Sequence, residues 1–313
     1  MSRISAKPIQ EKQIDLLRTS IVFLPDSILQ KTAANTSTKG FAVPGETGPN
    51  GLTPMLIQNI QFGFSKAKTG GHSARSMMFL EMRALVIAMP LAVTRDDFTK
   101  AVVDENLLEK PTLSSRKKSL RHLVELYGMD PTKALFRVLW VLGHEDLASL
   151  SQLCLVCAYA RDPQLRQSFE LIRTLRRGEV LARADMEQHI EDGFPDRFSP
   201  AMKKSMAQNV NTSWTFAEHL AGKKKKTRQL PEPRPVSAAY AMFVGYLAGL
   251  RGERLLDSAF ASLVASNRSQ LQVALSLASA KGLLSLKQAA GIVEFDFSNL
   301  LTPTEQVLFH ESH

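Results

Sequence analysis

The residues of this chain whose types and spacing best suit a chemical role are cations between positions 110 and 121. This stretch contains no Asp or Glu, and its basic side chains are Lys110, Arg116, Lys117, Lys118 and Arg121. Residues three or four positions apart share one face of a helix, so the last three predict a cationic helix surface. Such a surface can bind nucleic-acid phosphates, although a run of charge can also be a solvated face without a ligand.

A second basic stretch occupies residues 222–236, with the sequence GKKKKTRQLPEPRPV. Its prolines argue against regular structure, so we predict a linker. We expect this linker to contact phosphates through Lys223, Lys224, Lys225, Lys226 and Arg228. The alternatives are a solvated loop between domains and a nuclear import signal, although nothing else in the chain points to a nucleus. We also expect the two basic stretches to fold onto a common surface.

Three consecutive helices are expected to position the first basic stretch. The first runs from Ser73 to near Pro90, and the second follows a Thr94 cap and ends near Pro111. The third is capped by short hydroxyls and carries an apolar stripe; the cap is Ser114 with Ser115, and the stripe is Leu120, Leu123, Val124 and Tyr127. A helix, a turn and a basic helix in this order predict a helix-turn-helix-like module.

The remaining pattern predicts a mainly α fold, a helical bundle that ends in a small β-hairpin. Residues 131–222 have helical periodicity, and the apolar run from Leu147 to Tyr159 is expected at the centre. Residues 237–301 have the order of a winged-helix-like unit, with strands expected at 283–286 and 292–297. Glu294 and Asp296 would repel phosphates, so this unit suits protein docking or dimerisation as well as nucleic-acid binding.

These patterns divide the chain into five parts. We predict an N-terminal extension with a Gly/Pro-rich loop at 1–72 and an all-helical DNA-binding domain at 73–222. The basic linker at 223–236, the winged-helix-like domain at 237–301 and a tail at 302–313 follow.

Nothing in the sequence matches a catalytic or metal-binding pattern. The only cysteines, Cys154 and Cys157, lie in an apolar helical run, so we predict buried, reduced thiols. The histidines have no metal-ligand spacing, and there is no Gly-x-Ser-x-Gly elbow. The glycines of residues 33–54 are not followed by Gly-Lys-Ser or Gly-Lys-Thr, which argues against a phosphate-binding loop. We predict no catalytic activity, no metal and no cofactor, and we assign Trp214 to the core.

Composition supports a folded protein with a polyanionic partner. The chain has 313 residues, 44% of them hydrophobic, and a formal net charge of +9. This length accommodates about two domains, and the basic balance favours nucleic acid first and an anionic membrane second. No apolar run approaches the ~18 residues that a membrane span requires, so we predict a cytoplasmic protein without membrane contact.

The run ALVIAMPLAVTRDDFTKAVVDENLLEKPTLSSRKKSLRHLVEL resembles the BrxA family, an accessory component of the bacteriophage exclusion (BREX) defence systems. The shared pattern is a helix, a helix ending in the phrase from Glu105 to Lys110, a polar turn and a basic helix. The resemblance covers roughly residues 73–220, and the segments before and after it depart from the family. It implies an all-helical, non-catalytic protein that binds double-stranded DNA and works beside a methyltransferase and ATPases. By position, its implied contacts are Lys110, Arg116, Lys117, Lys118 and Arg121.

We therefore expect a non-catalytic DNA-binding accessory protein of bacterial anti-phage defence, which grips the duplex mainly through phosphates. Two alternatives stay open. One is a protein-interaction scaffold of a defence complex, and the other is a helical protein that binds structured RNA.

Overall fold

The computed structural model describes residues 59–68, 70–289 and 292–311. The Gly/Pro-rich loop expected in the N-terminal extension lies outside these residues. In chain order the helices are α3 (Phe79–Ala88), α4 (Arg95–Thr99), α5 (Leu113–Tyr127), α6 (Ala134–Glu145), α7 (Leu150–Arg161), α8 (Pro163–Thr174), α9 (Arg183–Gly193), α10 (Pro200–Phe216), α11 (Pro235–Leu247), α12 (Glu253–Leu256), α13 (Ala259–Val264), α14 (Arg268–Ala280) and α15 (Pro303–Glu311).

Short helical turns and strands complete this order. The turns are η2 (Ile60–Phe62), η3 (Gly71–Ser73) and η4 (Lys100–Asp104), which continues α4. The strands are β1 (Val180–Leu181), β2 (Leu220–Ala221), β3 (Lys226–Arg228), β4 (Ser285–Ala289) and β5 (Ile292–Asp296). The prediction of a mainly helical fold with a small C-terminal hairpin is confirmed.

Helix α7 forms the centre of the molecule, as its apolar sequence predicts. Every residue from Leu150 to Ala160 is buried. The helix packs against α3, α5, α6, α8, α10, α11 and α13. A helix that is apolar around its whole circumference needs such complete cover, and its neighbours come from both sides of the predicted linker.

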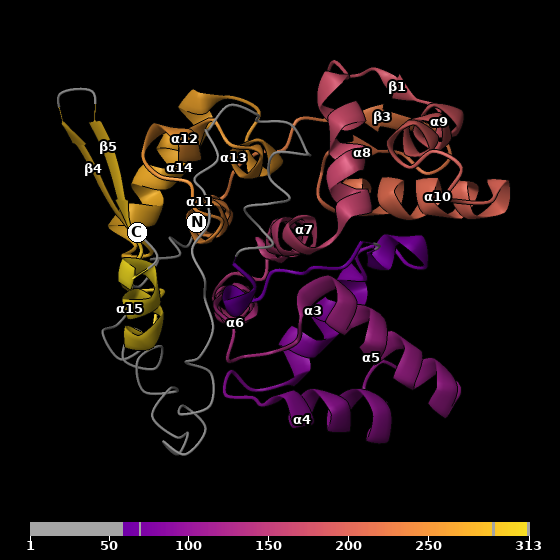
Figure 1. Ribbon diagram of the computed structural model, residues 1–313, viewed down its shortest axis with the longest axis horizontal. Coiled ribbons are helices and arrows are strands. Elements are labelled where there is room, and N and C mark those ends of the chain that lie inside the picture. The colour runs from indigo at the N-terminus through magenta and orange to yellow at the C-terminus, as the bar shows by residue number, and fades with distance from the viewer. Residues whose placement is uncertain (1–58, 69, 290–291, 312–313) are drawn as a thin grey trace, which may run out of the picture.

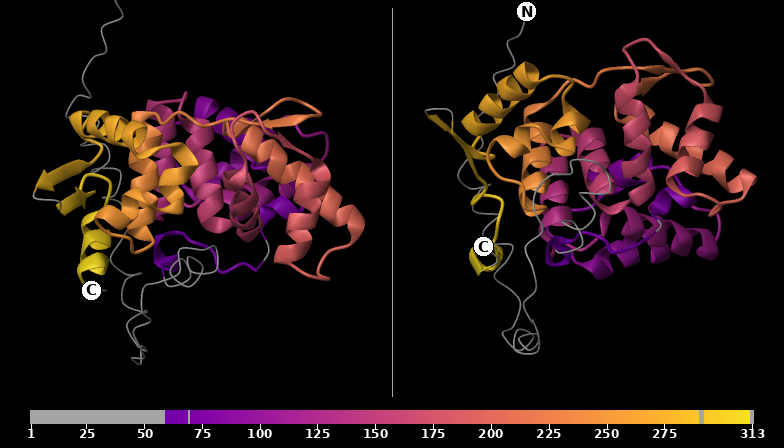
Figure 2. Two further views of the ribbon diagram at one scale, coloured as in Figure 1. Left: turned by 90° about the horizontal axis from the view of Figure 1, so that it is seen from above. Right: turned by 45° about the horizontal axis from the view of Figure 1, so that its top comes forward.

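Three groups of helices surround this centre (Figure 1). Helices α3 to α5 lie on one side of α7, and α8 to α10 with the β1–β3 sheet lie on the other. Helices α11 to α15 form the third group, from which the β4–β5 hairpin projects in all the ribbon views (Figure 2). The buried apolar side chains of the three groups form one continuous cluster.

The C-terminal hairpin follows the predicted alternation. Strands β4 and β5 are antiparallel, with Leu286 opposite Phe295. Val293 and Phe295 are buried, whereas Glu294 and Asp296 are exposed, so one face of β5 packs on the core and the other faces solvent. Helices α13 and α14 both pack on α11 just before the hairpin.

The expectation that residues 222–236 lack regular structure is wrong in two places. Lys226–Arg228 form β3, the middle strand of a three-stranded antiparallel sheet, in which Thr227 pairs with Val180 and Ala221. The last proline of the stretch, Pro235, begins α11, because proline is well suited to the first helical turn. The prolines therefore interrupt regular structure only between β3 and α11.

Two residue types predicted to be internal are confirmed as such. Trp214 is fully buried, donates its indole N–H to Ser168 Oγ at 2.9 Å, and stacks on Phe169. Cys154 and Cys157 are buried and free. Within the described part of the chain, no helix has the length and apolar character needed to cross a membrane.

Candidate nucleic-acid interface

Helix α5 carries the predicted cations, and its start differs from the prediction. The N-cap is Thr112, whose hydroxyl accepts from the Ser115 N–H at 3.1 Å while the Ser115 hydroxyl accepts from the Thr112 N–H at 3.1 Å. Ser114 and Ser115 thus lie inside the first turn rather than before it. Ser115 completes the cap, and Ser114 is left exposed to solvent.

The opposite face of α5 anchors the helix in the core. Leu123, Leu126 and Tyr127 are fully buried, and the Tyr127 hydroxyl donates to the carbonyl of Met77. Leu120 and Val124 of the predicted stripe are partly buried against the same core. Because one face is fixed in this way, the side chains of the other face are held at the surface.

The turn before α5 is built by the phrase that carries the family resemblance. The preceding helix ends at Asp104, earlier than predicted, and residues 105–112 form a connection. Asn106 and Glu109 adopt left-handed backbone angles, with φ of 56° and 52°. The Asn106 side-chain oxygen accepts from the Lys110 N–H at 2.8 Å. Asparagine tolerates this conformation better than most residues, so its place in the phrase has a conformational cause.

Two of the predicted contact residues take part in this turn. Lys110 Nζ lies 3.0 Å from Glu81 Oε1, and both side chains are partly buried. Arg116 donates to the Val103 carbonyl at 3.2 Å and to the Lys110 carbonyl at 3.5 Å. Both residues already have protein partners, and their cations support the geometry of the turn that presents α5.

The other three cations face solvent. Lys117 and Lys118 are exposed, and neither has a carboxylate partner among the residues described here. Arg121 is 63% exposed, and its Nε lies 3.6 Å from Glu125 Oε1, a distance that leaves its outer N–H groups accessible. The other carboxylate oxygen of Glu125, Oε2, lies 2.9 Å from His122 Nδ1, so the charge of Glu125 is shared between two partners. An exposed ion pair of this kind contributes little to stability.

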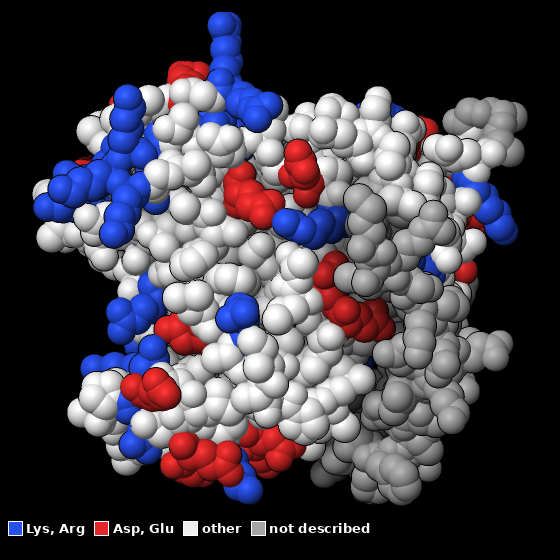
Figure 3. Space-filling view, turned by 180° about the vertical axis from the view of Figure 1, so that it is seen from behind, with Lys and Arg blue, Asp and Glu red and all other residues white. Residues whose placement is uncertain are grey.

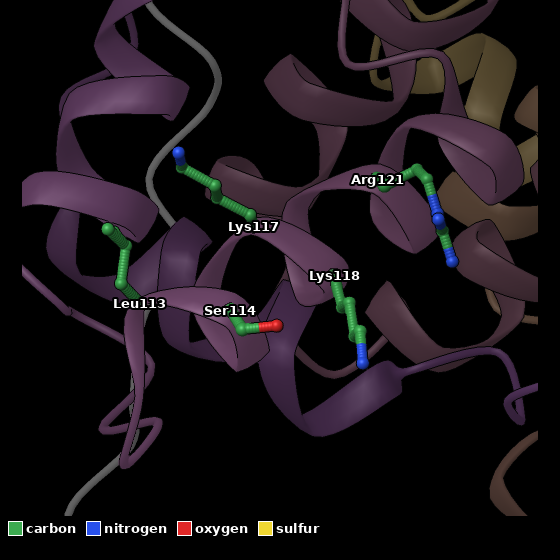
Figure 4. A pocket seen from close by; sticks show the side chains of 5 residues that line it. All are labelled: Leu113, Ser114, Lys117, Lys118 and Arg121. Atoms are coloured by element: carbon green, nitrogen blue, oxygen red, sulfur yellow. The ribbon is translucent and has the colours of Figure 1, made fainter.

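An open depression of about 410 Å³ lies along this face of α5, lined by Leu113, Ser114, Lys117, Lys118 and Arg121. Figure 4 shows that Lys117 points away from Lys118 and Arg121, so cations project on two sides of the helix. A second depression, of about 510 Å³, adjoins α5 and includes Arg95, Lys117 and Arg121 in its lining. The first depression has no carboxylate in its lining, whereas the second also contains Glu125.

The second basic stretch divides into exposed and internal cations. Lys223, Lys224 and Lys225 are exposed in the turn that connects β2 and β3. Lys226 Nζ donates to Thr215 Oγ1 and to the Gly222 carbonyl, both at 2.8 Å, and partial burial lowers the pKa of this lysine. The first three are therefore available to a ligand, and Lys226 is held by the fold.

Arg228 is an internal residue. It is 6% exposed, and its guanidinium bonds to the carbonyls of His219 and Gln229 and to His219 Nδ1. Burial lowers the pKa of Arg228. A guanidinium in this position cannot reach a phosphate, so we remove Arg228 from the candidate contacts.

The two basic segments lie in different helix groups. Helix α5 and the β1–β3 sheet occupy the same half of the molecule, one below and one above α7 in Figure 1. Seen from behind, Lys and Arg atoms occur on both groups along the left edge of Figure 3, and a hollow separates them. A single long ligand would have to bridge this hollow to touch both.

A buried polar cluster, which the sequence did not reveal, fixes the position of η3 beside α8 and α10. His72 Nδ1 lies 2.8 Å from Asp162 Oδ2, and His72 Nε2 lies 2.8 Å from Ser213 Oγ. A Cβ on Gly70 would lie 2.0 Å from the Asp162 carboxyl carbon, so this approach requires glycine. In the sequence, the Gly70-Gly71 pair is the one local feature that indicates this close approach.

Asp162, His72 and Ser213 contact one another in the order of a hydrolase triad, but a substrate cannot reach them. Ser213 Oγ already accepts from the Met77 N–H at 2.8 Å and donates to the Asn209 carbonyl at 3.0 Å. His72, Asp162 and Ser213 are all buried, and Ser213 lines neither of the two depressions beside α5. A nucleophile must contact its substrate, so the geometry assigns these residues to holding the chain together.

The described residues form no metal site, and the chain matches no known family. Over the described ranges, no group of three or more His, Cys, Asp or Glu side chains is arranged to hold a metal ion. No protein-family model matches the chain, and no curated protein is similar to it in sequence.

Proposed function

We propose that this protein binds duplex DNA without catalysing a reaction on it, and that phosphate contacts provide most of the affinity. The observation that carries the proposal is the exposed face of α5, where Lys117, Lys118 and Arg121 line a depression with no acidic residue in its lining. The overall charge of +9 adds long-range attraction for a polyanion. Lys223, Lys224 and Lys225 form a second exposed group of cations in the other helix group.

We further propose that the protein is a cytoplasmic accessory component of bacterial anti-phage defence. This setting rests on the resemblance of residues 73–220 to the BrxA family, and it implies partners that include a methyltransferase and an ATPase. The phrase from Glu105 to Lys110, on which the resemblance depends, forms the turn before α5, in which Asn106 is left-handed.

The test is a double charge reversal, Lys117→Glu with Lys118→Glu, titrated against duplex DNA over a range of salt. Each lost phosphate contact lowers the slope of log affinity against log salt by about one unit, so a decrease of about two units is expected. Both side chains are exposed, and circular dichroism of the variant should therefore match that of the wild type.

A matched control changes the same amount of charge elsewhere. Lys281 and Lys287 are exposed in the C-terminal helix group. The variant Lys281→Glu with Lys287→Glu should retain most of the affinity and the full salt slope. Equal losses in the two variants would show that only net charge matters, and an unchanged slope in the α5 variant would remove α5 from the interface.

A second candidate function, a protein-docking scaffold, is favoured by the surface of the C-terminal group. Val273 and Leu277, one helical turn apart on α14, are 63% and 52% exposed, and Ile292 on β5 is 72% exposed. The exposed Glu294 and Asp296 next to Ile292 disfavour phosphates. Co-purification of a neighbour-encoded protein that survives nuclease treatment, and is lost with Leu277→Glu, would support this function.

RNA is the remaining alternative, because a basic helix can also bind a structured RNA. Competition between duplex DNA and duplex RNA of equal length and equal charge separates the two. Preference for the RNA competitor would replace DNA in the proposal.

A further inference from the structure

The first residue of α5 is an apolar side chain that the fold does not use. Leu113 is 54% exposed, whereas Leu123 and Leu126 of the same helix are fully buried. It lies at one end of the depression of about 410 Å³ whose other lining residues are Ser114, Lys117, Lys118 and Arg121. The depression therefore combines one aliphatic group, one hydroxyl and three cations.

This combination suits a nucleic acid better than a protein surface. A protein surface that met three cations would have to supply carboxylates, whereas a nucleic acid supplies phosphates along its whole length. The major groove of DNA has phosphates on both rims, and on its floor the one apolar group is the 5-methyl of thymine. Leu113, at one end of a depression that is otherwise polar and cationic, offers an aliphatic group to such a methyl, and the groove is wide enough to admit an α-helix.

The directions of the side chains fit the two rims. Lys117 projects from one side of α5, while Lys118 and Arg121 project from the other (Figure 4). A helix lying in the groove with these cations on its flanks would place Lys117 near one strand and Lys118 and Arg121 near the opposite strand.

We infer that Leu113 contacts thymine methyl groups in the major groove of duplex DNA and so gives the protein a preference for thymine-containing sites. This inference rests on the proposed function, and it adds a base contact to the phosphate contacts. In this arrangement the lysines set the affinity, and Leu113 sets part of the specificity.

The experiment compares an alternating A·T duplex of about 20 base pairs with the same duplex in which uracil replaces every thymine. This replacement removes only the methyl groups from the groove. Burying one such group changes an affinity about fourfold, so the wild type should bind the thymine duplex at least about fourfold more tightly. Leu113→Ala should bind the two duplexes equally, and Lys117→Glu with Lys118→Glu should weaken both while keeping their ratio.

A control variant addresses nonspecific effects of removing a surface leucine. Leu80 on α3 is 60% exposed, and Leu80→Ala should retain the thymine preference in full. Equal wild-type affinity for the two duplexes would overturn the inference, and so would a preference that survives in Leu113→Ala. Absence of any duplex binding would overturn the proposed function itself, so the two failures are distinguishable.

Discussion

His72 and Asp162, which are 90 residues apart in the sequence, form a fully buried pair with 2.8 Å between Nδ1 and Oδ2. The same carboxylate oxygen accepts from the His72 N–H at 2.9 Å, and the other oxygen caps α8 through Gln164 and Leu165. Burial alone would raise the pKa of Asp162, but the charge and hydrogen bonds of His72 outweigh it and lower that pKa. This one carboxylate joins η3 to the start of α8.

Removing either partner should therefore be strongly destabilising. His72→Ala leaves a buried carboxylate without its main partner, and we expect the free energy of unfolding to fall by about 3–5 kcal/mol in urea titrations. The control is Glu187→Gln, which removes the exposed Arg183–Glu187 pair and should change stability by less than about 1 kcal/mol. A loss below about 1 kcal/mol in His72→Ala would contradict the structural role.

The stability of the protein should fall between pH 7 and pH 5 because of His219. Burial, followed by the charge of Arg228, lowers the pKa of this residue to about 3. At pH 5 the unfolded chain binds a proton at His219, whose ordinary pKa is about 6.5, and the native state does not. Linkage then lowers the free energy of unfolding by about 2 kcal/mol from pH 7 to pH 5. His219→Gln should reduce this decrease, and parallel pH curves for variant and wild type would argue against it.

The cations of the β2–β3 region should separate into stabilising and ligand-binding residues. Arg228→Met removes a buried guanidinium and leaves the Gln229 carbonyl without its side-chain donor, so it should lower the melting temperature. The same variant should keep the salt slope of DNA binding at a temperature where it is folded. Replacing Lys223, Lys224 and Lys225 by Ala should leave the melting temperature unchanged and lower the salt slope of DNA binding. A salt slope unaffected by the triple replacement would restrict the DNA interface to α5.

The two thiols should be unreactive in the native protein. Burial raises the pKa of the Cys157 thiol to about 11 and also raises that of Cys154. Because the thiolate is the reactive form, labelling by a disulfide reagent should be very slow without denaturant. Labelling should become fast at the urea concentration where far-UV circular dichroism shows unfolding. Rapid labelling in buffer alone would show that α7 opens locally.

Sequence periodicity predicted elements whose side chains alternate between apolar and polar. The buried face of α5 and the alternation of β5 are of this kind, since burial of one face dictates the residue pattern directly. The central position of α7 was predictable for the same reason. The strand β3 was not, because Lys226, Thr227 and Arg228 are all polar and give no contrast between faces.

The parts of the candidate site that the sequence could not predict depend on the folded geometry or on contacts between residues far apart in the chain. Three hydroxyl residues, Thr112, Ser114 and Ser115, precede the basic run, and only the folded geometry selects Thr112 as the cap. In the second basic stretch, composition cannot show that Arg228 turns inward while Lys223 to Lys225 stay in solvent. The contact between His72 and Asp162 leaves no periodic signal, because each partner is polar and isolated in its own segment.

The central position of α7 determines which fragments of the chain can fold. Helices that precede residue 222 and helices that follow residue 235 both cover it. A fragment ending at residue 222 would lose α11 and α13 and would expose apolar side chains of α7 to water. We therefore expect such fragments to aggregate, and the intact chain to melt in a single cooperative transition.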